Sequence, residues 1–166
     1  AVLILEFAPT IISLILAGKV GSYIASTIGT MRVSEQIDAL DIMGVNSPNF
    51  LSLPKIIACL IFNPILIAIS IVFGIGGGYI AGILTDNWTT ADYITGIQMY
   101  MPNLFIFYAF AKTFVFAFVI ATVPSYFGYF VKGGSLEVGR ASTQAVVWTM
   151  VFIIISELIL TQLILS

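Results

Sequence analysis

Three ionisable side chains stand inside otherwise apolar stretches of this chain: Glu6, Lys112 and Glu157. An ionised group in the interior of a lipid bilayer costs at least about 2.5 kcal/mol, so it needs an opposite charge or a watery cavity beside it. One cation between two carboxylates meets that need, either as a structural ion pair or as a site that holds a charged headgroup. The residue types leave both interpretations open.

The composition requires a membrane environment for these charges. Hydrophobic residues make up 60% of the chain and charged residues 8%, whereas a soluble domain carries roughly 25% charged residues. The segment 56–85 is uncharged over 30 residues, which exceeds the roughly 20 that a helix needs to cross a bilayer. The chain is therefore predicted to be an all-α integral membrane protein.

Apolar stretches predict four spanning helices, because a backbone in lipid must satisfy its own hydrogen bonds. The spans are expected at about 2–28, 56–84, 103–127 and 141–165. Small residues recur at four-residue spacing in the first two, where they would let another helix approach closely. They are Gly21, Ala25 and Gly29 in the first span, and Gly74, Gly78 and Gly82 in the second. A further short helix is expected at 90–100.

Between the first two spans, residues 34–44 are polar enough to lie in water and patterned as a short helix. Ser34 is expected to cap its start and Gly44 to close its end. Val33, Ile37 and Leu40 fall on one face of this helix. The pattern predicts an amphipathic helix of about three turns.

Basic residues set the orientation, since they concentrate in cytoplasmic loops. Arg32 and Lys55 flank the first loop, and Lys132 and Arg140 lie before the fourth span, so both loops are expected on the cytoplasmic side. Counted at about 1.5 Å per residue from that side, Lys112 lies about 23 Å out, Glu157 about 24 Å and Glu6 about 33 Å. All three then fall in the outer half, whereas Lys19, about 14 Å out, is expected to extend to the cytoplasmic interface.

Several site classes find no support in the sequence. A single cysteine, Cys59, and the lack of histidine leave no usual transition-metal site. The 166 residues form one predicted transmembrane domain, 1–166, with no room for a soluble catalytic domain. Because Ala1 begins directly in apolar sequence, the chain is expected to be a fragment whose amino-terminal part is missing.

The amphipathic helix predicted at 34–44 lies within a longer sequence motif. Residues 29–45 read GTMRVSEQIDALDIMGV and are followed by Pro54 and Lys55. The string resembles the signature of the MlaE/YrbE permeases of lipid-transport ABC systems. Further stretches are also similar to that family: LEFAP at 5–9, AGKVGS at 17–22, GG at 133–134 and GRASTQAVV at 139–147.

The resemblance implies a permease with five spans and an amino-terminal interfacial helix, in the inner membrane and without enzymatic activity of its own. It also implies a second copy of the permease, a cytoplasmic ABC ATPase that holds the ATP and Mg, and an outer-side MCE-domain protein. No cofactor is expected in this chain. Phospholipid would pass through a cavity between the two permeases and so maintain outer-membrane lipid asymmetry.

The same resemblance assigns residues to two sites. The lipid cavity would involve Leu5, Glu6, Lys112 and Glu157, with Leu5 where relatives often carry Arg and Glu157 where Asp is usual. The ATPase-coupling helix would use Glu35, Gln36, Ile37, Asp38, Ala39, Leu40, Asp41, Met43 and Gly44. Two other interpretations stay open: an ion- or proton-coupled secondary transporter built on the three membrane charges, and a structural scaffold subunit.

Overall fold

The computed structural model describes residues 3–99 and 103–165, apart from the side chains of 3–6, 103, 105, 164 and 165. Every regular element in these ranges is helical. Four helical stretches are long and apolar enough to cross a membrane: Phe7–Val33, Ser47–Leu84, Ile106–Tyr129 and Ser135–Leu163. The prediction of an all-α membrane protein with four spans is confirmed.

The helices extend beyond the predicted spans at one end of the bundle. The second span is α4 (Ser47–Leu84), the third α6 (Asn103–Tyr129) and the fourth α7 (Ser135–Leu165). Thus α4 begins nine residues before the predicted boundary and α7 six residues before it. Hydropathy marks only the part of a helix that suits lipid, whereas the backbone hydrogen bonds continue into water.

The first span alternates between two helix types. It consists of the π-helical segment η1 (Leu3–Ile11), α1 (Ile12–Leu16), the π-helical segment η2 (Ala17–Gly21) and α2 (Ser22–Val33). Its exposed side chains recur every four residues: Phe7, Ile11, Ile15, Lys19 and Tyr23. A stripe with that spacing would drift around an α-helix of 3.6 residues per turn, and the wider π turns offset the drift.

Helix α6 lies at the centre of the bundle and packs against α2, α4 and α7. Its buried face includes Phe116 and Ile120, which form a core with Ala17 and Ile153. The small residues of the first span make close approach possible here, as predicted. A side chain added at Gly128 of α6 would come within 2.7 Å of the Ala25 carbonyl oxygen.

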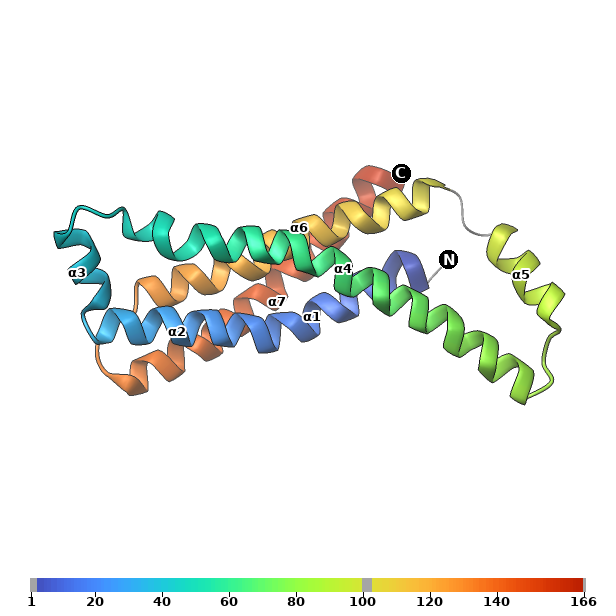
Figure 1. The fold of residues 1–166 in the computed structure, drawn as a ribbon, viewed down its shortest axis with the longest axis horizontal. Helices are drawn as coiled ribbons and strands as arrows, with labels where there is room; N and C mark the ends of the chain where they lie inside the picture. Colours follow the sequence, from blue (N-terminus) through green and yellow to red (C-terminus); the bar gives the residue numbers. More distant parts are fainter. Residues whose placement is uncertain (1–2, 100–102, 166) are drawn as a thin grey trace.

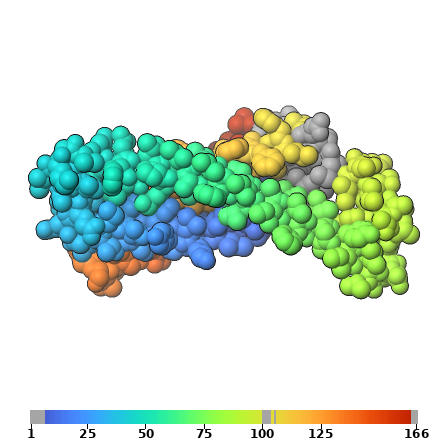
Figure 2. All heavy atoms as spheres, in the orientation of Figure 1, coloured from blue at the N-terminus to red at the C-terminus, as the bar shows by residue number. Residues whose placement is uncertain are grey.

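The second half of α4 leaves the bundle and runs to α5 (Thr90–Met99) (Figure 1). In the space-filling view, α4 forms a band along the first span and then continues without it toward α5 (Figure 2). The glycine face of α4 meets aromatic side chains there, since a Cβ at Gly78 would lie 3.0 Å from the Tyr93 hydroxyl. Gly78 therefore accommodates Tyr93 of α5, and Gly82 accommodates Trp88 of the turn before α5, rather than another span of this chain.

The loop helix α3 (Gln36–Ile42) and the connection between α6 and α7 lie at the same end of the bundle (Figure 1). The two basic loops of the sequence therefore share one end. Helix α5 lies at the opposite end. This arrangement agrees with the predicted grouping of the loops.

Candidate functional site

Among the side chains that the structure describes, those of Lys112 and Glu157 lie together. Lys112 on α6 forms an ion pair and a hydrogen bond with Glu157 on α7. The side chain of Lys112 is 0% exposed and that of Glu157 is 18% exposed. The predicted pairing of this cation with a carboxylate at similar depth is therefore observed, and the ammonium lies in the protein interior.

Polar residues from three helices surround this pair. The Thr10 hydroxyl on η1 donates to the second carboxylate oxygen of Glu157 at 2.5 Å. The Lys112 ammonium lies 4.5 Å from the centroid of the Tyr108 ring, where the negative face of the ring attracts a cation. The Tyr108 hydroxyl in turn shares a hydrogen bond of 2.7 Å with Thr161. The result is a polar cluster within the apolar bundle.

Sequence reasoning missed Thr10, Tyr108 and Thr161. Each stands four residues from one of the predicted charges, Glu6, Lys112 or Glu157, and residues at that spacing share a helix face. A search for polar side chains at this spacing would have found all three. The predicted cavity residues Leu5 and Glu6 lie in η1, but their side chains are outside the described part of the chain.

An apolar recess of about 160 Å³ lies between the first span, α4 and α6. Its walls include Leu16, Phe62 and Ala117, together with Asn63. The Asn63 side chain donates to the Thr113 carbonyl at 3.2 Å, which joins α4 to α6. The recess can receive an apolar chain, and Asn63 fixes the two helices that form it.

The second predicted site, residues 34–44, folds as the short helix α3 between α2 and α4. Ile37 is fully buried against Ile24, Ile28 and Leu51, and Leu40 packs partly against the same cluster. The predicted inward face is thus confirmed for Ile37 and Leu40. Val33 belongs to α2, the preceding helix.

The two ends of α3 differ in how well they were predicted. The Ser34 cap is wrong: its hydroxyl donates to the Thr30 carbonyl at 2.7 Å and so satisfies the end of α2, because α3 begins only after Glu35, which has a left-handed backbone at φ 65°. The closing role of Gly44 is confirmed at φ +80°. The Val45 amide donates to the Leu40 carbonyl at 3.0 Å, as expected for a glycine-terminated helix.

The outward surface of α3 combines acidic and large apolar side chains. Of the residues assigned to the coupling helix by resemblance, the exposed ones are Glu35, Gln36, Asp38, Ala39, Asp41, Met43 and Gly44. Met43 is 74% exposed and Ile42, absent from that set, is 87% exposed. Ile37 and Leu40 hold the helix in place, whereas Ile42 and Met43 are exposed on its outward side.

Comparison with known proteins identifies relatives over nearly the whole chain. A family described as Permease MlaE matches residues 1–163. A probable ABC transporter permease protein of Rickettsia bellii is 39% identical over 95% of this chain and 61% of its own length. One from Synechocystis is 34% identical over 95% of this chain and 60% of its own length.

A plant relative is also similar to this chain. The chloroplastic protein TRIGALACTOSYLDIACYLGLYCEROL 1 of Arabidopsis thaliana is 31% identical over 95% of this chain and 45% of its own length. The chain therefore spans about three fifths of the bacterial relatives named above and less than half of the plant protein.

Proposed function

The chain belongs to the MlaE permease family, and from that premise we propose that it is the permease subunit of an ABC transporter for phospholipids. It moves lipid between the inner membrane and an outer-side MCE-protein carrier, and so maintains outer-membrane lipid asymmetry. Two copies of the permease enclose the lipid path. A separate cytoplasmic ATPase binds ATP and Mg and supplies the energy.

The observation that carries this proposal is the exposed apolar surface of α3. Ile42 and Met43 are 87% and 74% exposed at the end of the bundle that holds both basic loops. Large apolar side chains held in water on a well-anchored helix favour a protein partner. An ATPase groove that accepts α3 is such a partner, and the basic loops favour the cytoplasmic side for this contact.

The polar cluster of Lys112 and Glu157 supports a lipid as the transported molecule. Its cation and carboxylate match the opposite charges of a phospholipid headgroup, and the nearby apolar recess suits an acyl chain. Transport then follows from a population shift: nucleotide binding closes the ATPases, α3 moves with them, and the cavity between the two permeases changes shape.

Reconstitution of the complete permease with its ATPase tests the proposal. Fluorescent phosphatidylethanolamine is included in proteoliposomes of phosphatidylethanolamine and phosphatidylglycerol. Its transfer to an acceptor protein is measured in the presence of ATP and, separately, of a non-hydrolysable ATP analogue. We expect transfer only with ATP. Transfer that needs no ATPase and follows an ion gradient would support a secondary transporter instead.

Two matched variants test the role of α3. Ile42→Asp is expected to abolish ATPase binding, because it places a charge in the apolar contact. Leu84→Asp is the control, since Leu84 is 79% exposed at the end of α4 away from α3. Equal ATPase recovery with both variants would contradict the proposed docking surface.

A further inference from the structure

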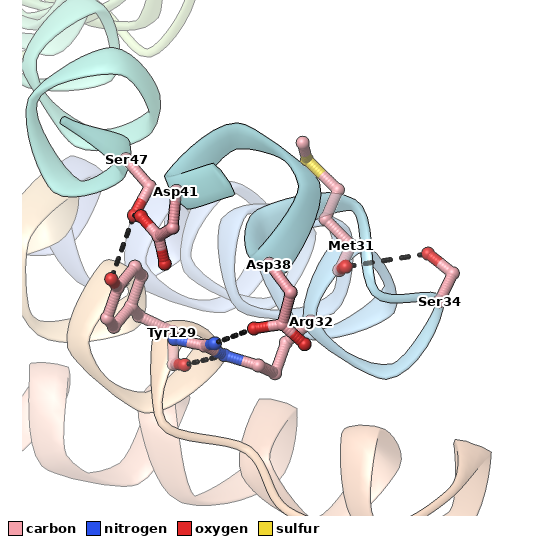
Figure 3. Close-up of polar contacts among 7 residues, drawn as sticks. All are labelled: Met31, Arg32, Ser34, Asp38, Asp41, Ser47 and Tyr129. Atoms are coloured by element: carbon pink, nitrogen blue, oxygen red, sulfur yellow. Dashed lines mark hydrogen bonds and ion pairs between the residues drawn. The ribbon is translucent and has the colours of Figure 1, made fainter. Parts of the chain in front are cut away.

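The ends of α2, α4 and α6 meet α3 in one polar cluster, here called the clasp: Arg32, Asp38, Asp41, Ser47 and Tyr129 (Figure 3). Tyr129 is the last residue of α6, and both its backbone and its side chain take part. Arg32 lies in the last turn of α2, and Ser47 is the first residue of α4. The clasp therefore joins α3 to each of the helices that surround it.

Arg32 connects the start of α3 to the end of α6. Its Nε donates to the Tyr129 carbonyl at 2.7 Å, and its guanidinium lies 4.4 Å from the centroid of the Tyr129 ring. The same guanidinium pairs with Asp38 at 3.1 Å. The last carbonyls of a helix lack partners within the helix and attract cations. Arg32 thus completes the end of α6 while it holds α3.

A second chain of hydrogen bonds connects the other end of α3 to the same tyrosine. The Ser47 hydroxyl donates to the Asp41 carboxylate at 2.7 Å and lies 2.9 Å from the Tyr129 hydroxyl. Ser47 is fully buried, whereas the Asp41 side chain at the end of this connection is exposed. Both ends of α3 therefore converge on Tyr129.

Helix α6 links the clasp to the buried ion pair. It is continuous from Asn103 to Tyr129, and Lys112 lies seventeen residues before Tyr129, about 26 Å along the axis. A displacement of α3 must either carry the end of α6 with it or break the charge-assisted hydrogen bonds of Arg32. The first alternative moves the helix that bears Lys112.

We propose that the clasp couples α3 mechanically to α6, with Arg32 and Tyr129 as the positioning residues that pass nucleotide-driven motion toward Lys112. This inference rests on the proposed function, because it assumes that an ATPase moves α3. It goes further in naming the route: motion enters the membrane through side-chain contacts with α6 as well as along the backbone into α2 and α4.

The test uses the complete permease assembled with its ATPase in the proteoliposomes described above. The measured quantity is the coupling ratio, the number of fluorescent lipids transferred per ATP hydrolysed. Arg32→Gln removes the charge that joins Asp38 to Tyr129. The control is Arg140→Gln, which removes an exposed ion pair of similar length, 3.0 Å to Glu137 against 3.1 Å for Arg32 and Asp38, at the same end of the bundle.

We expect Arg32→Gln to lower the coupling ratio at least about tenfold, the range typical of a coupling between two sites. Complex assembly and ATP hydrolysis should stay within about twofold of wild type, and Arg140→Gln should leave the ratio unchanged. Tyr129→Phe should lower the ratio about threefold, as for one neutral hydrogen bond. Ser47→Ala should lower it at least as far, because it also removes the bond to the Asp41 carboxylate. The double variant Tyr129→Phe/Ser47→Ala should be no worse than Ser47→Ala alone, because the bond between the two residues is already lost there.

An unchanged ratio in Arg32→Gln would overturn the inference while leaving the proposed function intact. So would a loss of transport that only parallels a loss of assembled complex, since that marks a purely structural contact. If wild type shows no ATP-dependent transfer, the proposed function fails and the inference fails with it.

Discussion

The ion pair of Lys112 and Glu157 allows a quantitative test, because the two partners differ in burial. The Lys112 side chain is 0% exposed, whereas that of Glu157 is 18% exposed and also accepts a hydrogen bond from Thr10. Removal of one partner of a buried pair costs about 3–5 kcal/mol, while replacement of both by apolar residues is often neutral. The single and double variants should therefore differ sharply.

We expect Glu157→Leu to lower the free energy of unfolding by about 4 kcal/mol, because the lysine cation stays in a fully buried position. Lys112→Met should cost less, about 2 kcal/mol, because the remaining carboxylate keeps the Thr10 hydroxyl and some access to water. The double variant Lys112→Met/Glu157→Leu should return to within about 1 kcal/mol of wild type.

Thermal unfolding of the complete permease in detergent measures these differences. At about 3 °C per kcal/mol for a protein of this size, the midpoint Tm should fall by about 12 °C for Glu157→Leu and about 6 °C for Lys112→Met. Recovery in the double variant is the critical observation. If the two losses simply add in the double variant, the reasoning about a coupled pair is refuted.

The double variant also distinguishes the two interpretations of the membrane charges. Its native-like stability would allow lipid contact to be measured without interference from unfolding. Loss of crosslinking to a photoactivatable phospholipid would indicate a headgroup site, and retained crosslinking would indicate a structural ion pair.

Further predictions concern α3 and the lysines. Ile37→Ala should cost about 3 kcal/mol locally and raise amide hydrogen exchange in this short helix about a hundredfold; unchanged protection would show that Ile37 does not anchor it. Gly44→Ala should lower the free energy of unfolding by about 1 kcal/mol, because φ is positive at this residue. Gly76→Ala should raise it slightly, because Gly76 lies within helix α4 and an added Cβ has no neighbour within 4 Å. Thermal unfolding of the two variants measures this difference. Lys112→Ala should weaken phospholipid crosslinking more than Lys19→Ala does, and equal effects would contradict a headgroup role for Lys112.

Some of the site followed from helix periodicity. A short helix in this loop, its inward residues Ile37 and Leu40, and its termination at Gly44 were predicted, since each depends on local spacing or on one backbone angle. The helix is seven residues long, Gln36–Ile42, and therefore shorter than the three turns predicted for 34–44. The start of α3 was not predicted. The Ser34 hydroxyl could have bonded either to the end of α2 or to the start of α3. Because the left-handed backbone at Glu35 separates Ser34 from α3, the hydroxyl bonds to α2.

The clasp shows what local spacing cannot reveal. Arg32 and Tyr129 are 97 residues apart in the chain, and no motif or spacing in the sequence indicates that they are in contact. Their contact depends on how α2 and α6 cross, which is fixed by the close approach at Ala25 and Gly128. The π-helical segments of the first span likewise had no recognised signal in the sequence.

By itself, the sequence determined the membrane environment, the four apolar helices, the amphipathic loop helix and the need of each buried charge for a partner. These follow from the cost of placing polar groups in lipid, which acts on every segment separately. Tertiary structure decided that Lys112 pairs with Glu157, that Thr10 and Tyr108 complete the cluster, and that Tyr129 joins both ends of α3. Such choices depend on the relative rotation and crossing of packed helices, which no single segment contains.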